Sequence, residues 1–180
     1  MTSRTANLTG FRSTVFIGLG SNLDNPVAQV QQAMLEVDEI ADSALVKISS
    51  FYESAPVVDH DGNRDQPAYI NAVAELTTTL SPQELMQALL AIESRHQRVR
   101  SEKSAPRTLD LDILIFNEWR IDSPELTTPH PRAHERAFVL HPLIEIAPDV
   151  YIPGKGYARD FLAGVAGQAI RRLHDANAIA

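Results

Sequence analysis

The chain has 180 residues and a net charge of −7, with 44% hydrophobic and 22% charged residues. These values are typical of one globular domain and disfavour a general nucleic-acid binder, which needs a strongly positive face. The absence of cysteine excludes a disulfide scaffold, a thiolate zinc site, an iron–sulfur cluster and a cysteine nucleophile. No apolar run approaches the ~20 residues of a membrane span, and the first residues lack a signal-peptide stretch. We therefore expect a cytoplasmic protein that binds neither nucleic acid nor membranes.

The first part of the chain predicts a tail, a strand, a helix and a second strand. Residues 1–13 lack periodicity, so we expect a disordered tail followed by a single domain over residues 14–180. The apolar run at 15–19 predicts a buried strand, and Asp-Asn-Pro at 24–26 favours the start of a helix. Alternating polarity at 45–52 predicts the second strand.

The middle of the chain predicts a long loop, two further strands and a second helix. Residues 53–66 are polar and aperiodic, whereas residues 69–76 predict a strand. Ser-Pro-Gln-Glu at 81–84 is typical of a capping box with proline at the first helical position. Residues 109–116 predict the last strand of this part.

This order predicts an α+β fold with a ferredoxin-like βαββαβ core, in which both helices pack on one face of a mostly antiparallel four-stranded sheet. The remaining third, the C-terminal extension, is divided into short pieces by Pro129, Pro131, Pro142, Pro148 and Pro153. Apolar residues at helical spacing over 160–174 predict a final helix there.

Asp110 and Asp112 are separated by one residue of the predicted strand, so their carboxylates project from the same face. Leu111 and Ile113 then face the core. Two neighbouring carboxylates repel each other unless a cation lies between them, and Mg²⁺ prefers one or two carboxylates together with phosphate oxygens and water. A solvent-facing edge strand with an acidic outer face explains the same pattern without a metal.

A basic segment precedes this pair. Five basic residues and one acidic residue lie between Arg95 and Arg107, which gives the segment a net charge of +4. It is either a solvated helix end or a site for a small polyanion such as a nucleotide. Because Arg107 lies three residues before Asp110, the two features together indicate a site for a metal–nucleotide complex.

Other nucleotide and metal motifs are incomplete. Gly18 and Gly20 follow a predicted strand without the third glycine of a dinucleotide fingerprint, and no Walker-type phosphate loop is present. His130 and His134 are four residues apart, but Pro131 disfavours the helical turn on which they would bind a metal.

Three further residues allow two interpretations each. Glu93 lies within the apolar arc of the second predicted helix. It is either a core carboxylate neutralised by an arginine or a group that orients a cationic side chain or a ligand hydrogen. Tyr69 and Phe138, taken singly, are either core aromatics or stacking partners of a ligand.

Six segments occur in an order typical of one enzyme family: GSNL at 20–23, QPAYINA at 66–72, PRTLDLDI at 106–113, PHPR at 129–132, RAFVL at 136–140 and EIAP at 145–148. Together they resemble the 6-hydroxymethyl-7,8-dihydropterin pyrophosphokinases of folate biosynthesis over about residues 15–150. The resemblance implies a ferredoxin-like fold. It also implies transfer of an intact pyrophosphate from ATP to the hydroxymethyl group of the reduced pterin, with two Mg²⁺ ions and release of AMP.

The resemblance also implies site residues. Asp110 and Asp112 would hold both metal ions, and the catalytic set would be Arg98, Arg107, Asp110 and Asp112. The pterin would be bound by Ser54, Ala55, Val57, Tyr69, Asn71 and Phe138. Of these, Tyr69 and Phe138 would stack on the ring and Asn71 would bind its polar edge. ATP would be surrounded by Glu93, Arg98, Arg100, Lys103, Ile113, Thr127, His130 and Arg136.

The chain departs from the family pattern at two places, and the residues leave other functions open. Ser104-Ala105 stand where family members often carry Trp-Gly, and the loop after Val57 is longer than in compact members. No strong general base is evident, although Asp112 is a candidate proton acceptor. The alternatives are another Mg²⁺-dependent phosphotransferase and a non-catalytic nucleotide-binding module. We expect a monomer whose partners are small molecules, ATP and a reduced pterin.

Overall fold

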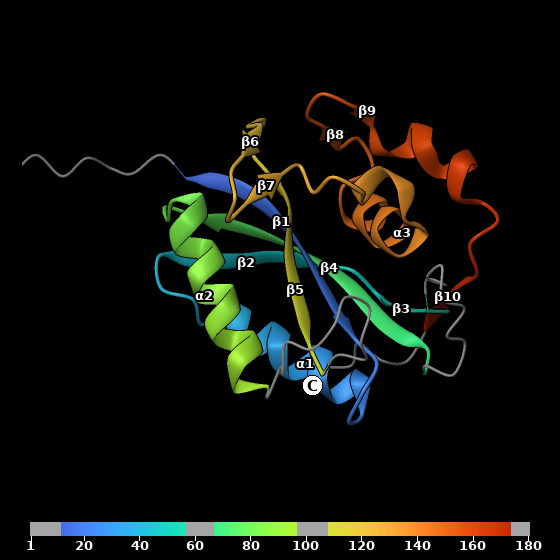
Figure 1. The fold of residues 1–180 in the computed structure, drawn as a ribbon, viewed down its shortest axis with the longest axis horizontal. Coiled ribbons are helices and arrows are strands. Elements are labelled where there is room, and N and C mark those ends of the chain that lie inside the picture. The colour runs from blue at the N-terminus through green and yellow to red at the C-terminus, as the bar shows by residue number, and fades with distance from the viewer. Residues whose placement is uncertain (1–11, 57–66, 97–107, 174–180) are drawn as a thin grey trace, which may run out of the picture.

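The computed structural model describes residues 12–56, 67–96 and 108–173. Within these residues, six strands form one antiparallel sheet in the order β10-β3-β4-β1-β5, and β2 also pairs with β4 (Figure 1). The strands of this sheet are β1 (Ser13–Ser21), β2 (Ser43–Ile48), β3 (Phe51–Ser54), β4 (Tyr69–Thr78), β5 (Asp110–Phe116) and β10 (Ile170–Leu173). Two small ribbons pair β6 (Ile121–Asp122) with β7 (Thr127–Thr128) and β8 (Tyr151–Ile152) with β9 (Gly156–Tyr157).

The core of the sheet has the predicted ferredoxin-like order. Helix α1 (Pro26–Asp38) connects β1 to β2, and α2 (Pro82–Arg95) connects β4 to β5. Both helices cover one face of the sheet, as predicted, and α3 (Ala137–Ile146) covers the other (Figure 1). Two 3₁₀ helices, η1 (Ala133–Glu135) and η2 (Ala158–Val165), flank α3 in the chain. None of the helices in the described ranges is long and apolar enough to cross a membrane.

Alternation along β1 divides the interior into two layers. Ile17 and Leu19 are buried with the apolar residues of α1 and α2. Phe16 lies on the other face, with Leu140 and Leu143 of α3. Because successive residues of a strand point to opposite faces, a single apolar run supplies both layers.

The two helices that connect core strands begin where the sequence predicts. Ser81 accepts a hydrogen bond from the Glu84 amide while the Glu84 carboxylate accepts one from the Ser81 amide, which completes the predicted capping box. At the start of α1, Asn25 occupies the N-cap with φ 62°, but its side chain makes no capping hydrogen bond. Pro26 at the first helical position therefore fixes this start instead.

Two predicted boundaries near the start of the chain are wrong. Ser13 is not part of a tail, because it is buried and pairs with Thr78 as the first residue of β1. The predicted strand 45–52 is two strands, β2 and β3, separated at Ser49 and Ser50. Both strands pair with β4, so the break divides one edge into two segments.

The predicted final helix over 160–174 is also wrong. Residues 158–165 form the 3₁₀ helix η2, which accounts for the helical spacing of Phe161, Leu162 and Val165. Gly164 and Gly167 disfavour continuation as an α-helix, since each glycine costs about 1 kcal/mol relative to alanine. The chain then forms β10, which pairs with the open edge of β3 and extends the four-stranded core.

Candidate active site

A cavity of about 180 Å³ lies between the sheet and the start of α3. Its walls come from β1, β3, β4, β5 and the segment that leads into α3. Eight of the residues predicted to bind substrates or metal line it: Ser54, Ala55, Tyr69, Asn71, Asp110, Asp112, Arg136 and Phe138. Tertiary structure therefore brings together residues that are more than 80 positions apart in the chain.

The strand register orders these residues into rows across the sheet. Gly20 of β1 is paired with Asn71 on one side and with Asp110 on the other. In the next row of the same face, Gly18 lies between Val73 and Asp112. Adjacent strands are ~4.8 Å apart, so Asn71 and Asp110 stand about 10 Å apart across β1. Asn71, the amide wall, thus faces the carboxylate wall of Asp110 and Asp112. The floor between them is formed by Gly18 and Gly20.

The two glycines keep this floor open. A Cβ atom at Gly18 would lie 3.3 Å from Cδ2 of Leu114, and one at Gly20 would lie 3.4 Å from Oδ1 of Asn71. Both strand positions point into the cavity, where a side chain would occupy the space between the walls. Gly18 and Gly20 do not complete a dinucleotide fingerprint. Their lack of side chains instead leaves space for a ligand in the cavity.

The amide wall is organised by hydrogen bonds. Nδ2 of Asn71 donates to Oγ of Ser54 at 2.9 Å and to the carbonyl oxygen of Tyr52 at 3.3 Å. Asn71 is only 5% exposed, so these bonds fix its orientation. Its Oδ1 atom is left facing the floor near Gly20. This arrangement suits the polar edge of a flat ligand.

The two aspartates of the carboxylate wall lie on one face of β5, as the strand alternation predicts. Asp110 and Asp112 both line the cavity, whereas Leu111 and Ile113 are buried in the opposite layer with α1 and α2. No third histidine, aspartate or glutamate joins them in a metal-binding cluster within the three described ranges. Two carboxylates that face an open cavity fit Mg²⁺, which keeps several waters and takes its other ligands from phosphate oxygens.

Two arginines provide positive charge opposite these carboxylates. Arg136 precedes α3, and its Cζ atom lies 5.5 Å from the ring centroid of Phe138. Its Nε atom is buried and has no acceptor in the part of the chain that the structure describes. Burial lowers the pKa of Arg136 and the nearby charge of Arg132 lowers it further, while Asp112 and Asp110 act in the opposite direction. An anionic ligand would supply the missing acceptor.

His130 lies beside this charged group without lining the cavity. Burial and the charge of Arg136 lower its pKa from 6.5 to about 4, against the opposing effect of Asp110. Its Nδ1 atom accepts a hydrogen bond from the Arg132 amide at 3.1 Å. The neutral ring therefore carries its proton on Nε2, which leaves that atom as a donor.

The remaining described residues of the predicted ATP set lie away from the cavity. Glu93 is 2% exposed on α2, and its Oε1 atom accepts a hydrogen bond from the Leu111 amide at 2.8 Å. This carboxylate thus holds the backbone between the two aspartates. Ile113 is buried beneath β5, and Thr127 lies in β7, where its hydroxyl contacts Asp122.

Five predicted residues fall outside the described ranges, and the sequence prediction missed others. Those outside are Val57, Arg98, Arg100, Lys103 and Arg107. The missed residues are Gly18 and Gly20 of the floor and Arg132 of the charged wall. The spacing of two between the glycines on a predicted strand was the available signal, because it places both on one face.

Comparison with known proteins places this arrangement in context. A family model described as 7,8-dihydro-6-hydroxymethylpterin-pyrophosphokinase (HPPK) matches residues 16–148. The chain is 43% identical over 159 residues to the 2-amino-4-hydroxy-6-hydroxymethyldihydropteridine pyrophosphokinase of Pseudomonas aeruginosa, covering 88% of this chain and 96% of that one. It is 40% identical over 161 residues to the enzyme of the same name from Haemophilus influenzae, covering 89% and 98%.

Solved structures show the same fold. Wild-type Plasmodium falciparum HPPK-DHPS with pterin and p-hydroxybenzoate aligns with a TM-score of 0.67 at 14% identity. The match covers 88% of this chain and 44% of that chain. The chain therefore spans less than half the length of that protein, and the match shows a shared fold alone.

Proposed function

Because the chain belongs to the 7,8-dihydro-6-hydroxymethylpterin-pyrophosphokinase family, we propose that its reaction takes place in the cavity between β1 and α3. The reaction is transfer of pyrophosphate from ATP to 6-hydroxymethyl-7,8-dihydropterin, with release of AMP, in folate biosynthesis. Family membership decides between this reaction and the two alternatives that the residues left open.

The pterin occupies the side of the cavity next to β3 and β4. Tyr69 and Phe138 stack on its ring, and Asn71 binds its polar edge, with Ser54 and Ala55 beside it. The observation that supports this orientation is the row Asn71, Gly20, Asp110, in which the amide and the carboxylate stand on opposite sides of a glycine. A ring held at Asn71 directs its substituent across β1 toward the aspartates.

The triphosphate occupies the side of the cavity next to β5. Asp110 and Asp112 would hold two Mg²⁺ ions, which neutralise phosphate charge and polarise the phosphorus that is attacked. Arg136 and Arg132 bind phosphate oxygens, and the buried Nε of Arg136 gains an acceptor. Nε2–H of His130 donates to the nucleotide, and Glu93 keeps the Leu111 amide, and with it both aspartates, in place. Ile113, Thr127 and the arginines and lysine of 98–107 complete the predicted set.

Substitution of either aspartate tests the metal assignment. Asp110→Asn or Asp112→Asn is expected to lower AMP release by at least ~10²-fold, because a ligand of the charge-neutralising ions is lost. The thermal unfolding temperature should stay close to that of wild type, since asparagine keeps the size of the side chain. Calorimetric titration with MgATP should show a parallel loss of binding.

Asp160→Asn is the matched control, because Asp160 is exposed on η2 and does not line the cavity. It should behave as wild type. Near-normal turnover in either Asp110→Asn or Asp112→Asn would refute the metal assignment.

We also propose that the protein acts as a cytoplasmic monomer formed by one domain. The absence of cysteine fits a reducing compartment. Exposed large apolar residues are few in the described ranges: Leu35, Val46, Trp119, Tyr151 and Tyr157. Light scattering coupled to size-exclusion chromatography should give the mass of one 19.8 kDa chain.

A further inference from the structure

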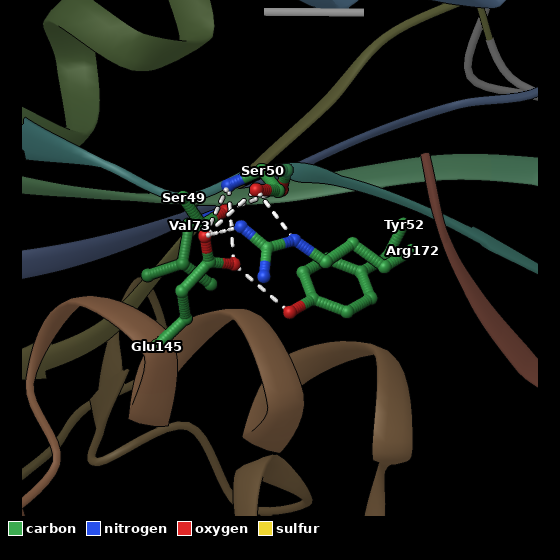
Figure 2. Close-up of polar contacts among 6 residues, drawn as sticks. All are labelled: Ser49, Ser50, Tyr52, Val73, Glu145 and Arg172. Carbon is green, nitrogen blue, oxygen red and sulfur yellow. Dashed lines mark hydrogen bonds and ion pairs between the residues drawn. The ribbon is translucent and has the colours of Figure 1, made fainter. Parts of the chain in front are cut away.

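Glu145, near the end of α3, belongs to the EIAP segment that the reaction does not otherwise use. Its Oε1 atom accepts a hydrogen bond from the Ser50 hydroxyl at 2.7 Å, and its Oε2 atom accepts one from the Tyr52 hydroxyl at 2.9 Å. The Ser50 amide donates to both oxygens at 3.2 Å. Arg172 of β10 pairs with Oε1 at 2.9 Å (Figure 2). One carboxylate therefore connects α3, β3 and β10.

The strand break at Ser49 and Ser50 makes this connection possible. The Ser49 amide donates to the Val73 carbonyl oxygen, and the Val73 amide donates to Oγ of Ser49 at 2.9 Å. The Ser49 side chain thus takes a place in the sheet that a backbone carbonyl group would fill. The next amide, that of Ser50, points away from β4 and reaches Glu145 (Figure 2).

The network leads into the proposed pterin pocket along β3. The carbonyl oxygen of Tyr52 and the hydroxyl of Ser54 both accept hydrogen bonds from Asn71. Tyr52 therefore contacts Glu145 through its side chain and Asn71 through its backbone. The position of β3 relative to α3 sets the position of the amide wall.

The network leads into the same pocket along α3. Phe138 precedes Glu145 by seven residues, which is about two helical turns and the same face. His141 lies between them on this face, with its ring centroid 6.3 Å from that of Tyr52. Glu145 therefore connects the helix that carries Phe138 to the strand that holds Asn71.

We propose that Glu145 is a positioning residue that sets the gap between Phe138 and Asn71, and with it the affinity for the pterin ring. This inference rests on the pterin pocket proposed above. Asp110 and Asp112 stand on β5, which is separated from Asn71 and the Glu145 network by β1. Loosening the network is therefore expected to weaken binding of the pterin more than binding of the nucleotide.

Steady-state kinetics of Glu145→Gln test the proposal, because the amide keeps the size of the side chain but loses its charge and one acceptor. We expect the KM for the pterin to rise about five- to tenfold, with the KM for ATP and kcat changed by less than about twofold. Tyr52→Phe removes one hydrogen bond and should raise the pterin KM by about threefold. The double variant should have the same pterin KM as Glu145→Gln, since both changes act on one network.

Glu53→Gln is the matched control. Glu53 pairs with Arg171 at 3.0 Å, so it also joins β3 to β10, but it takes no part in the Glu145 network. Its pterin KM should remain that of wild type. The proposal would be overturned if Glu145→Gln raised the KM values for pterin and ATP equally. A lower unfolding temperature of Glu145→Gln without a change in its pterin KM would also overturn it. If Glu145→Gln does not fold, Tyr52→Phe gives the same comparison.

Phe138→Ala separates this inference from the pocket assignment. A normal pterin KM in Phe138→Ala would mean that the ring does not stack there, and the pocket itself would be wrong. A raised KM in Phe138→Ala together with a normal one in Glu145→Gln would refute only the positioning role of Glu145.

Discussion

At the scale of single residues, the protonation of His130 follows from its surroundings. The ring is partly buried, Arg136 is close, and the Arg132 amide donates to Nδ1. Burial and the charge of Arg136 both oppose a second proton on the ring. The hydrogen bond from the Arg132 amide occupies Nδ1, the atom that would take this proton. His130 is therefore suited to donate from Nε2 at neutral pH rather than to attract phosphate by charge.

Titration of His130 checks this description. Its pKa of about 4 in the folded protein lies below the ordinary value of 6.5. The folded state thus binds fewer protons, so stability is complete above pH ~6.5 and falls as the pH decreases toward the folded-state pKa. Imidazole NMR signals of the metal-free and nucleotide-free protein should show this titration and the Nε2–H tautomer. A midpoint near 6.5 would contradict the burial argument.

The sequence predicts residue roles well where they depend on local alternation. Asp110 and Asp112 could be placed on one face because a strand has a period of two. The partner of Glu93 could not be predicted, because the Leu111 amide reaches it only when α2 packs against β5. Arg132 was missed for the same reason, since its proximity to Arg136 depends on the turn through η1.

At the scale of elements, serines and glycines decide where the predictions fail. Residues 45–52 have the alternation of one strand, and only the hydrogen bonds of Ser49 and Ser50 show why the strand breaks. The apolar spacing of 160–174 is helical, yet β10 forms because β3 offers an unpaired edge. A neighbouring edge is a tertiary property that periodicity does not contain.

The connection between α3 and β3 should show in the acid dependence of stability. Burial alone would raise the pKa of Glu145, but hydrogen bonds from Ser50 and Tyr52 and the charge of Arg172 hold it below its ordinary value. The contribution to stability is therefore complete above the unfolded-state pKa of about 4.3 and is lost as the pH falls through the lower folded-state pKa.

Thermal unfolding between pH 7 and pH 3 measures this effect. Wild type should exceed Glu145→Gln in unfolding temperature at neutral pH, and the difference should shrink below pH ~4.3. Glu53→Gln controls for the loss of one carboxylate that pairs with an arginine of β10. A difference between wild type and Glu145→Gln that is independent of pH would contradict the charged state of Glu145.

At the scale of the whole molecule, the sequence predicts the core and misses its extension. The element order and the arrangement of both connecting helices on one face are confirmed. The sheet is wider than predicted, because β10 returns from the C-terminal part to cover the edge of β3 (Figure 1). The C-terminal part thus contributes both α3, which roofs the cavity, and the strand that supports its amide wall.

Deletion of residues 170–180 tests the role of this outer strand. The loss of β10 and of Arg172 should lower the unfolding temperature by roughly 5 °C and raise the pterin KM, while turnover persists. Deletion of residues 174–180 alone is the control and should leave both quantities unchanged. Equal effects of the two deletions would assign them to the last seven residues instead of β10.

The glycine floor has a consequence for resistance to inhibitors. A compound that reaches the floor touches the backbone at Gly18 and Gly20, where any substitution adds atoms next to Leu114 or Asn71. Such a change narrows the cavity for the natural ring as well as for the compound. A substitution that weakens such a contact therefore also weakens the reaction. Contacts with exposed side chains outside the cavity can be lost by substitution with less effect on the reaction.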